Sequence, residues 1–163
     1  MKIIGIDPGL SGGIAVLENN KVLNIFDMPV MSEGKKNKRQ LNSAQLVSLI
    51  KENINSDEDI TVVIEQVNAM PGQGVTSMFN FGQTFGAIKG VCAALELPIF
   101  FVRPSKWKKH FELINSSKDA SRTKVIEMYP ILSNQLAKKK DVNKSDAILI
   151  GRFYSETRLI ENN

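Results

Sequence analysis

The order of the apolar segments constrains the fold of this chain more than any other feature. Three short apolar runs fall within residues 1–28 and are separated by Pro8-Gly9 and Asn19-Asn20, which favour tight turns. This spacing predicts a three-stranded antiparallel meander. Further along, segments with helical periodicity alternate with the apolar runs TVVIEQV at 61–67 and LPIFFV at 97–102. The order predicts an α/β fold: a mixed five-stranded sheet, its first three strands antiparallel, with helices on both faces.

Apolar residues at helical spacing, together with start and stop signals, indicate where the helices lie. The segment MSEGKKNKRQ at 31–40 is polar and basic, and it is predicted to be a loop. Helices are predicted over 41–54, over about 76–95, from an N-cap at Ser116 or Ser117 to a stop at Pro130, and from about Asn143 onward.

The length and composition are those of a soluble globular protein, and residues 1–163 are expected to form one domain. No apolar run reaches the ~18 residues of a membrane span, so no membrane association is expected. Cys92 is the only cysteine, which excludes an intrachain disulfide and a cysteine-built zinc site. A reducing cytoplasm is the expected compartment, either associated with the nucleoid or, for a phage-encoded protein, in the host.

Positive charge is concentrated in one part of the chain. Residues 103–144 hold eleven Lys and Arg against four Asp and Glu, although the net charge of the whole chain is only +4. A basic half favours a polyanionic partner such as DNA. The alternative is a solvated lysine-rich face.

Glu65 is anomalous because it lies within a run of β-branched residues. With a side-chain period of two, it shares a strand face with Val63 and Val67. A buried carboxylate costs several kcal/mol unless a metal or a charged partner compensates it. Glu65 therefore either leans into solvent at a strand end or belongs to a functional site.

Two further carboxylates favour the functional interpretation. Asp7 closes the first strand, and Asp146 lies on the inward stripe of the last helix, in line with Leu149 and Phe153. Like charges that converge in a dry site raise one another's pKa unless a cation holds them. Mg²⁺ and Mn²⁺ prefer carboxylate oxygens, so the sequence predicts a divalent-metal site formed by Asp7, Glu65 and Asp146.

Five sequence blocks occur in a characteristic order: GIDPGLSGGIAV, IEQV followed by a Gly-rich loop, FGQTFGAIKG, VRPSKWKKHF and KKDVNKSDAILI. Together they resemble the RuvC-type Holliday junction resolvases of the RNase H-like superfamily, with the motif style of phage and chloroplast members. The resemblance extends from residue 2 to about residue 155. Asp7, Glu65 and Asp146 match the family's metal-binding acids.

The resemblance implies an RNase H-like fold, a homodimer and two Mg²⁺ ions per active site, with Mn²⁺ as a substitute and no small-molecule cofactor. It also implies paired symmetric nicks across a four-way DNA junction, leaving 5′-phosphate and 3′-hydroxyl ends. Two competing hypotheses stay open. One is a related nuclease that acts on flaps, forks or other branched DNA, and the other is a non-catalytic DNA-binding relative or an actin-type nucleotide binder.

The segment RPSKWKKHF has the composition of a DNA-backbone groove, with cations around Trp107. The alternative is a basic surface turn with Trp107 in the core. The predicted backbone contacts are Arg103, Lys106, Lys108, Lys109 and Lys118.

The bacterial members have an aromatic residue three positions after the glutamate, which wedges against bases at the crossover. Here that position is Asn68. Met70, Met78 and Phe79 are the apolar candidates for the wedge, although Met78 and Phe79 are equally compatible with a core position.

Gly82, Gly86 and Gly90 form a stripe at i+4 spacing on one helix. The stripe predicts a close contact, either with the sheet or, as the resemblance implies, with the same helix of a second subunit.

The fourth metal ligand is less clear, because the family's position three residues before the final aspartate is Asn143. Asp141 is the predicted ligand, provided that it lies before the helix and that Asn143 is the N-cap. Two alternatives remain: Asp141 neutralises Lys138–Lys140, or Asn143 is itself the ligand.

Overall fold

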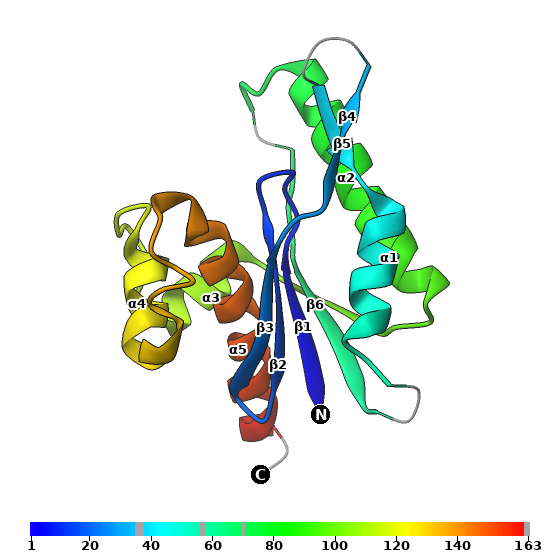
Figure 1. The fold of residues 1–163 in the computed structure, drawn as a ribbon. Coiled ribbons are helices and arrows are strands. Elements are labelled where there is room, and N and C mark those ends of the chain that lie inside the picture. Colours follow the sequence, from blue (N-terminus) through cyan, green and yellow to red (C-terminus); the bar gives the residue numbers. More distant parts are fainter. Residues whose placement is uncertain (35–37, 56–57, 70, 162–163) are drawn as a thin grey trace.

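Two layers of helices cover the two faces of a five-stranded sheet (Figure 1). The computed structural model describes residues 1–34, 38–55, 58–69 and 71–161. The strands are β1 (Lys2–Asp7), β2 (Gly13–Glu18), β3 (Lys21–Asp27), β4 (Val30–Glu33), β5 (Lys38–Leu41), β6 (Ile60–Glu65) and β7 (Ile99–Val102). The helices are α1 (Ser43–Glu52), α2 (Val75–Ala94), α3 (Pro104–His110), α4 (Ala120–Met128) and α5 (Val142–Glu161), with short 3-10 turns at Pro130–Leu132 and Lys139–Asp141. None of these helices is long and apolar enough to cross a membrane.

The sheet confirms the predicted α/β fold. Its strand order is β3-β2-β1-β6-β7. The pairs β1–β2 and β2–β3 are antiparallel, whereas β6 is parallel to β1 and β7 is parallel to β6. The meander and the alternating segments of the sequence therefore form one mixed sheet.

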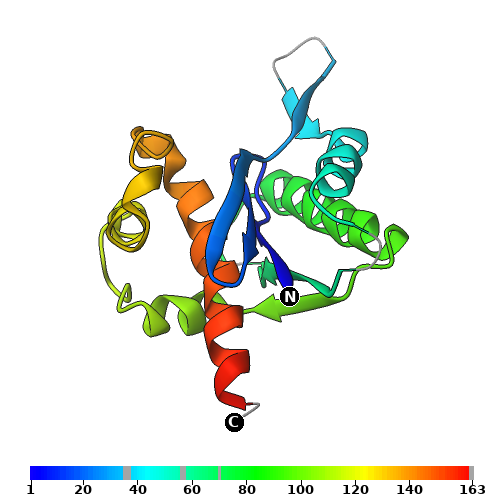
Figure 2. The same ribbon diagram turned by 60° about the horizontal axis from the view of Figure 1, so that its bottom comes forward.

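The strands alternate their side chains between two separate cores. Ile4 and Ile6 of β1 and Ile64 of β6 pack with α1 and α2, whereas Ile3 and Val63 pack with α3, α4 and α5. Figure 2 shows the two helix layers on opposite sides of the sheet. By this alternation, Asp7 at the end of β1 and Glu65 at the end of β6 face the α5 layer.

Close contact between α5 and β1 depends on glycine. A Cβ atom at Gly5 would lie 2.1 Å from the carbonyl oxygen of Ala147 and 2.9 Å from the backbone nitrogen of Gly151. Both of these neighbours are helix backbone, which cannot move aside without displacing α5. The absence of a side chain at Gly5 thus lets the helix that carries Asp146 lie directly against the strand that carries Asp7.

We expect Gly5→Ala to lower the free energy of unfolding by about 3 kcal/mol, because the added methyl overpacks this contact. For a chain of this size the loss corresponds to a decrease in Tm of about 6–12 °C. The matched control is Gly9→Ala, where a Cβ would make only ordinary van der Waals contacts, the nearest at 3.6 Å from the backbone nitrogen of Gly12. Equal Tm values for the two variants in thermal denaturation would contradict the role of Gly5.

The prediction of a polar loop over residues 31–40 is wrong in part, because β4 and β5 pair there as a two-stranded antiparallel hairpin. Residues 35–37 lie outside the described residues. The hairpin extends away from the main sheet (Figure 2). Most of its side chains are exposed, so neither strand shows the apolar alternation by which a strand is recognised.

Two predicted helix starts also differ from the structure. The helix α4 begins at Ala120, and Asp119 precedes it without a capping hydrogen bond from its side chain. The Asp119 carboxylate instead binds Arg122 at 2.6 Å, so neither Ser116 nor Ser117 is the N-cap. The helix α5 begins one residue earlier than predicted, at Val142. Asn143 is therefore inside its first turn, and its side-chain amide donates a hydrogen bond to the carbonyl of Ser11.

Candidate active site

Three carboxylates meet at one end of the sheet, beneath the first turns of α5. Asp7 and Glu65 directly follow Ile6 and Ile64, which are paired across the parallel strands β1 and β6. Asp146 belongs to α5, which packs on β1 and β2. The sheet alternation and the Gly5 contact therefore place Asp7, Glu65 and Asp146 on the same side of the sheet and within electrostatic reach of one another. We call this group the three carboxylates.

Burial and mutual repulsion make the charged state of this group costly. Burial, followed by repulsion from Glu65 and Asp146, raises the pKa of Asp7 to about 8, against the opposing effect of the Lys108 ammonium. Burial also raises the pKa of Glu65 and of Asp146. Structural ion pairs normally lower the pKa of a carboxyl group, so these shifts indicate a site in which the charge of Lys108 does not offset burial and repulsion.

The residues present fit a hard divalent cation. One oxygen of Asp146, Oδ1, is buried without a hydrogen-bond partner, and a carboxylate-only donor set is the type that Mg²⁺ and Mn²⁺ favour. Across the described ranges, no three His, Cys, Asp or Glu side chains stand close enough together to hold a metal ion in this conformation. The donor chemistry therefore fits such an ion, whereas joint coordination by the three carboxylates would need their side chains to move closer together.

Neutral hydrogen-bond donors hold two of the three carboxylates. The indole Nε1 of Trp107 donates to Oε1 of Glu65 at 2.9 Å. A hydrogen bond from Ser121 opposes the burial that raises the pKa of Asp146. Lys108 adds positive charge near all three carboxylates. The sequence did not assign Ser121 to the site, and it offered Trp107 only as a core residue or a neighbour of DNA.

A hollow of about 260 Å³ opens beside Asp146. It brings together Asp146 and two of the predicted DNA-binding residues, Lys108 and Lys118. Asn143 and the hydroxyl-bearing residues Ser116, Ser117 and Ser121 also line it. Cations and hydroxyl groups around a cavity next to a carboxylate site are suited to a phosphate group.

The structure does not bring Asp141 to the three carboxylates. Asp141 precedes α5, as predicted, but it is only 3% exposed and its carboxylate closes a local cap. It accepts a hydrogen bond from the backbone N–H of Lys138 at 2.8 Å and pairs with Lys144 at 3.0 Å. Burial alone would raise the pKa of Asp141, but these two partners hold it below its usual value. These contacts resemble the charge-neutralising alternative, except that the side-chain ion pair is with Lys144 and not with Lys138–Lys140.

The other predicted DNA contacts lie on or next to α3, a helix that the sequence did not predict. Arg103, Lys106 and Lys109 are exposed there, and Lys118 is exposed in the following loop. Trp107 is fully buried on the same helix. The segment RPSKWKKHF is thus both a core element and a basic surface, because its helical turn directs Trp107 inward and several of its cations outward.

The candidate wedge residues have different environments. Phe79 is 65% exposed on α2, whereas Met78 is half-buried and lines a small hollow with Phe81 and Phe85. Met70 lies outside the described residues. Of the two that can be placed, Phe79 is the one with its ring free at the surface.

The glycine stripe of α2 is open. A Cβ at Gly82, Gly86 or Gly90 would meet no atom within 4 Å. Val75 and Phe79 extend the same helix with side chains that are 80% and 65% exposed. The stripe therefore does not pack on the sheet, so the first of its two predicted roles is wrong. The contact with the same helix of a second subunit stays a prediction.

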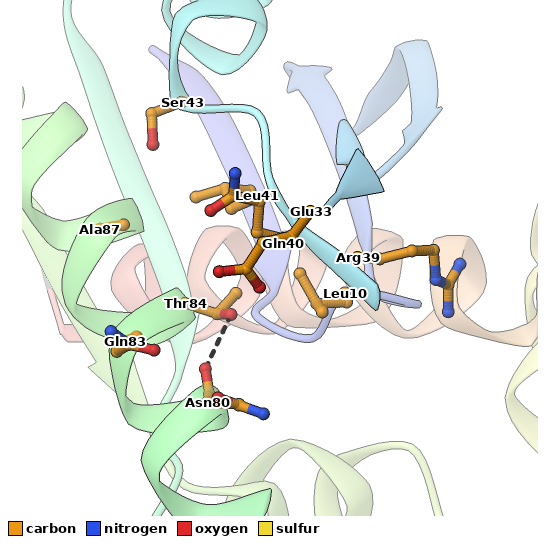
Figure 3. Close-up of a pocket in the computed structure, with 10 residues that line it drawn as sticks. All are labelled: Leu10, Glu33, Arg39, Gln40, Leu41, Ser43, Asn80, Gln83, Thr84 and Ala87. Carbon is orange, nitrogen blue, oxygen red and sulfur yellow. Dashed lines mark hydrogen bonds between the residues drawn. The ribbon is translucent and has the colours of Figure 1, made fainter. Parts of the chain in front are cut away.

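A second hollow lies on the opposite face of the molecule, between β5 and α2 (Figure 3). Its volume is about 200 Å³. Glu33 and Arg39 contribute one charge of each sign, and Gln40, Asn80 and Gln83 contribute uncharged polar groups. None of the three carboxylates lines this hollow, so it is separate from the candidate active site.

Comparisons with known proteins agree with this geometry. The sequence profile of the family described as crossover junction endodeoxyribonuclease RuvC matches residues 3–152. A structure of Thermus thermophilus RuvC is 17% identical, with 97% of each chain covered and a TM-score of 0.53. A second, of T. thermophilus RuvC in complex with Holliday junction substrate, is 16% identical, with 96% of each chain covered and a TM-score of 0.58. A search among curated proteins gives no match.

The two structural likenesses support the fold, since their identity is low, whereas the profile match extends over nearly the whole chain. Asp7, Glu65, Trp107 and Asp146 all fall within the matched residues. The predicted resemblance is confirmed: the chain belongs to the RuvC family of crossover junction endodeoxyribonucleases.

Proposed function

We propose that this protein is a divalent-metal-dependent endonuclease that resolves four-way (Holliday) DNA junctions by paired symmetric nicks. Membership of the RuvC family supports the reaction class. The observation that carries the proposal for this chain is the convergence of the three carboxylates, which includes a buried Asp146 oxygen without a partner.

In this proposal Asp7, Glu65 and Asp146 hold the metal, with two Mg²⁺ ions per site and Mn²⁺ as a substitute. Held by these carboxylates, the ions would supply Lewis-acid chemistry at the scissile phosphate, which would favour attack by a water and departure of the 3′ oxygen. Asn143 lines the same hollow as Asp146, so it is better placed than Asp141 to complete the site. The expected products carry 5′-phosphate and 3′-hydroxyl ends.

The chain's own cations position the DNA. Lys108 and Lys118 line the hollow beside Asp146, where each can neutralise a backbone phosphate next to the cleaved bond. Arg103, Lys106 and Lys109 extend this positive surface along α3. Phosphate contacts fix the register of the duplex without reading its sequence.

We expect the double variant Lys106→Ala/Lys108→Ala to weaken binding to all DNA and to flatten the slope of log K against log[salt] by about one unit per lost contact. Fluorescence anisotropy with a four-way junction at several salt concentrations measures this slope. The control is Lys51→Ala, which removes one exposed charge from α1, in the opposite helix layer. A slope unchanged from that of the wild type would mean that the α3 lysines belong to a solvated surface that does not contact DNA.

The proposal includes a homodimer, because two nicks in opposed strands call for two active sites related by a two-fold axis. The open glycine stripe of α2, flanked by Val75 and Phe79, is the surface suited to the second copy. Glycines let two helix backbones approach closely, and the exposed apolar side chains gain burial on association.

Gly86→Leu is expected to shift the protein toward the monomer, since the new side chain separates the two helices, while a Cβ at this position meets no atom of its own chain within 4 Å. Analytical ultracentrifugation at micromolar concentration should show a dimer for the wild type and mainly an 18.1 kDa species for the variant. Circular dichroism controls for folding. A wild-type protein that sediments only as the monomer, with and without junction DNA, would rule the dimer out.

The decisive experiment compares cleavage of a mobile four-way junction, a flap and a plain duplex, each with and without Mg²⁺. Paired nicks in the junction alone, only with Mg²⁺, are the expected result. Preferential cutting of the flap would instead identify a nuclease for other branched DNA. Tight junction binding without cleavage in Mg²⁺ or Mn²⁺ would identify a non-catalytic binder.

A further inference from the structure

Trp107 connects the protein core to the candidate active site. It is the only tryptophan of the chain, and its side chain is fully buried in the core beneath α5. Its Nε1–H donates to Oε1 of Glu65 at 2.9 Å. A buried indole N–H normally requires an acceptor, and here the acceptor is one of the three carboxylates. The packing of the ring therefore fixes where this carboxylate oxygen lies.

The choice of acceptor points to a role beyond packing. A backbone carbonyl would satisfy an indole N–H without a buried charge, whereas the Glu65 carboxylate is costly to keep ionised at this depth. We propose that Trp107 is a positioning residue, which holds Oε1 of Glu65 in place so that Oε2 is presented to the divalent cation. This inference rests on the proposed function, since that function assigns Glu65 to the metal.

The position of Trp107 on α3 links metal binding to phosphate binding. The next residue, Lys108, places its ammonium 5.3 Å from the centre of the Trp107 ring and near the three carboxylates. The end of α3 is fixed to α5 by a 2.5 Å contact between His110 and Glu156. The short helix α3, which is anchored at its end, thus fixes the positions of both the Glu65 carboxylate and the Lys108 ammonium, the cation that faces the DNA backbone.

Asp146 follows the same pattern as Glu65. A hydrogen bond from Ser121 acts on its carboxyl group, while its Oδ1 is buried without a partner. In both carboxylates a neutral donor from the helix layer holds the group, which leaves acceptor capacity for a cation. Such outer contacts orient metal ligands, and their loss typically weakens metal affinity by about 10–100-fold.

The test measures metal binding directly and in the absence of DNA. Mn²⁺ is titrated into the full-length wild type and into Trp107→Phe, and affinity is measured by calorimetry and by electron paramagnetic resonance. We expect Trp107→Phe to bind Mn²⁺ at least about 10-fold more weakly. Replacement of Trp107 by benzothienylalanine, which keeps the ring shape and exchanges the N–H for sulfur, should give the same loss with a Tm near that of the wild type.

The matched control is Phe111→Leu. Phe111 is 5% exposed, lies in the same core and directly follows α3, so its truncation loosens the core without removing a donor to Glu65. It should lower the Tm and leave Mn²⁺ affinity within about twofold. Because Trp107 is the sole tryptophan, quenching of its emission by Mn²⁺ gives an independent titration in the wild type, with the same half-saturation as calorimetry.

Two outcomes would overturn the inference. One is wild-type Mn²⁺ affinity in both Trp107 variants, which would make Trp107 a core residue only. The other is an equal loss of affinity in Phe111→Leu, which would attribute the effect to general loosening. The proposed function fails separately: a wild type that binds Mn²⁺ but cuts no junction overturns the nuclease, while weaker Mn²⁺ binding in Trp107→Phe still upholds the positioning role.

Discussion

Asp7→Asn, Glu65→Gln and Asp146→Asn are each expected to reduce cleavage of a four-way junction by at least about 1,000-fold, because each removes a carboxylate ligand of the proposed metal site. Affinity for the junction in metal-free buffer should stay within about threefold, since phosphate contacts from the lysines supply most of it. Single-turnover cleavage and anisotropy measure the two quantities separately.

Asp141→Asn is the matched control for these variants. It also removes a carboxylate, from the turn just before α5, but this carboxylate pairs with Lys144 and caps the turn at Lys138. We expect near wild-type cleavage and a moderate loss of stability. Near wild-type cutting by any of the other three variants would refute the assignment of that residue, and an inactive Asp141→Asn would restore Asp141 as a ligand.

The sequence predicted the fold well where local patterns and global packing agree. Turn residues and apolar runs defined the meander, and the period of two on β6 placed Glu65 on the same face as Val63, as the structure confirms. The convergence of Asp7, Glu65 and Asp146 could be predicted for the same reason. Strand ends and the inward stripe of a helix are positions that a sequence pattern specifies directly.

The details that could not be predicted depend on contacts between distant residues. The orientation of Asp141 is decided by Lys144 and by the turn at Lys138, not by its distance from Asp146 along the chain. The helix α3 has only one buried residue, Trp107, so it has no apolar periodicity to recognise. Asn143 resembled an N-cap, but the carbonyl of Ser11 lies within its reach and engages its amide instead.

The second large effect concerns stability in the absence of metal, where Asp7→Asn is expected to be more stable than the wild type. The pKa of Asp7 is raised from 3.8 to about 8 on folding, first by burial and then by repulsion from Glu65 and Asp146. A raised pKa means that the folded state binds the proton more tightly. The contribution of Asp7 to the free energy of unfolding is therefore fully present below about pH 4, and it is lost as the pH rises toward 8.

Asparagine carries no charge between pH 4 and pH 8, so Asp7→Asn does not lose stability as the pH rises through this range. In EDTA at pH 7.5 we expect it to exceed the wild type by at least about 1 kcal/mol, or about 2–4 °C in Tm, with no difference at pH 4. Mg²⁺ should raise the Tm of the wild type more than that of the variant, because a ligand that binds only the folded state stabilises it.

Glu127→Gln, which removes an exposed carboxylate from α4, is the charge-matched control and should show no such pH-dependent gain. If Asp7→Asn instead lowers the Tm at pH 7.5 in EDTA, the Asp7 carboxylate stabilises the fold by itself. The buried Asp7 carboxylate beside Glu65 and Asp146 would then have a structural role, and it would not be a destabilising group retained for metal binding. Higher stability in EDTA, a smaller stabilisation by Mg²⁺ and lost cleavage, all in one variant, form the combination that a metal site predicts.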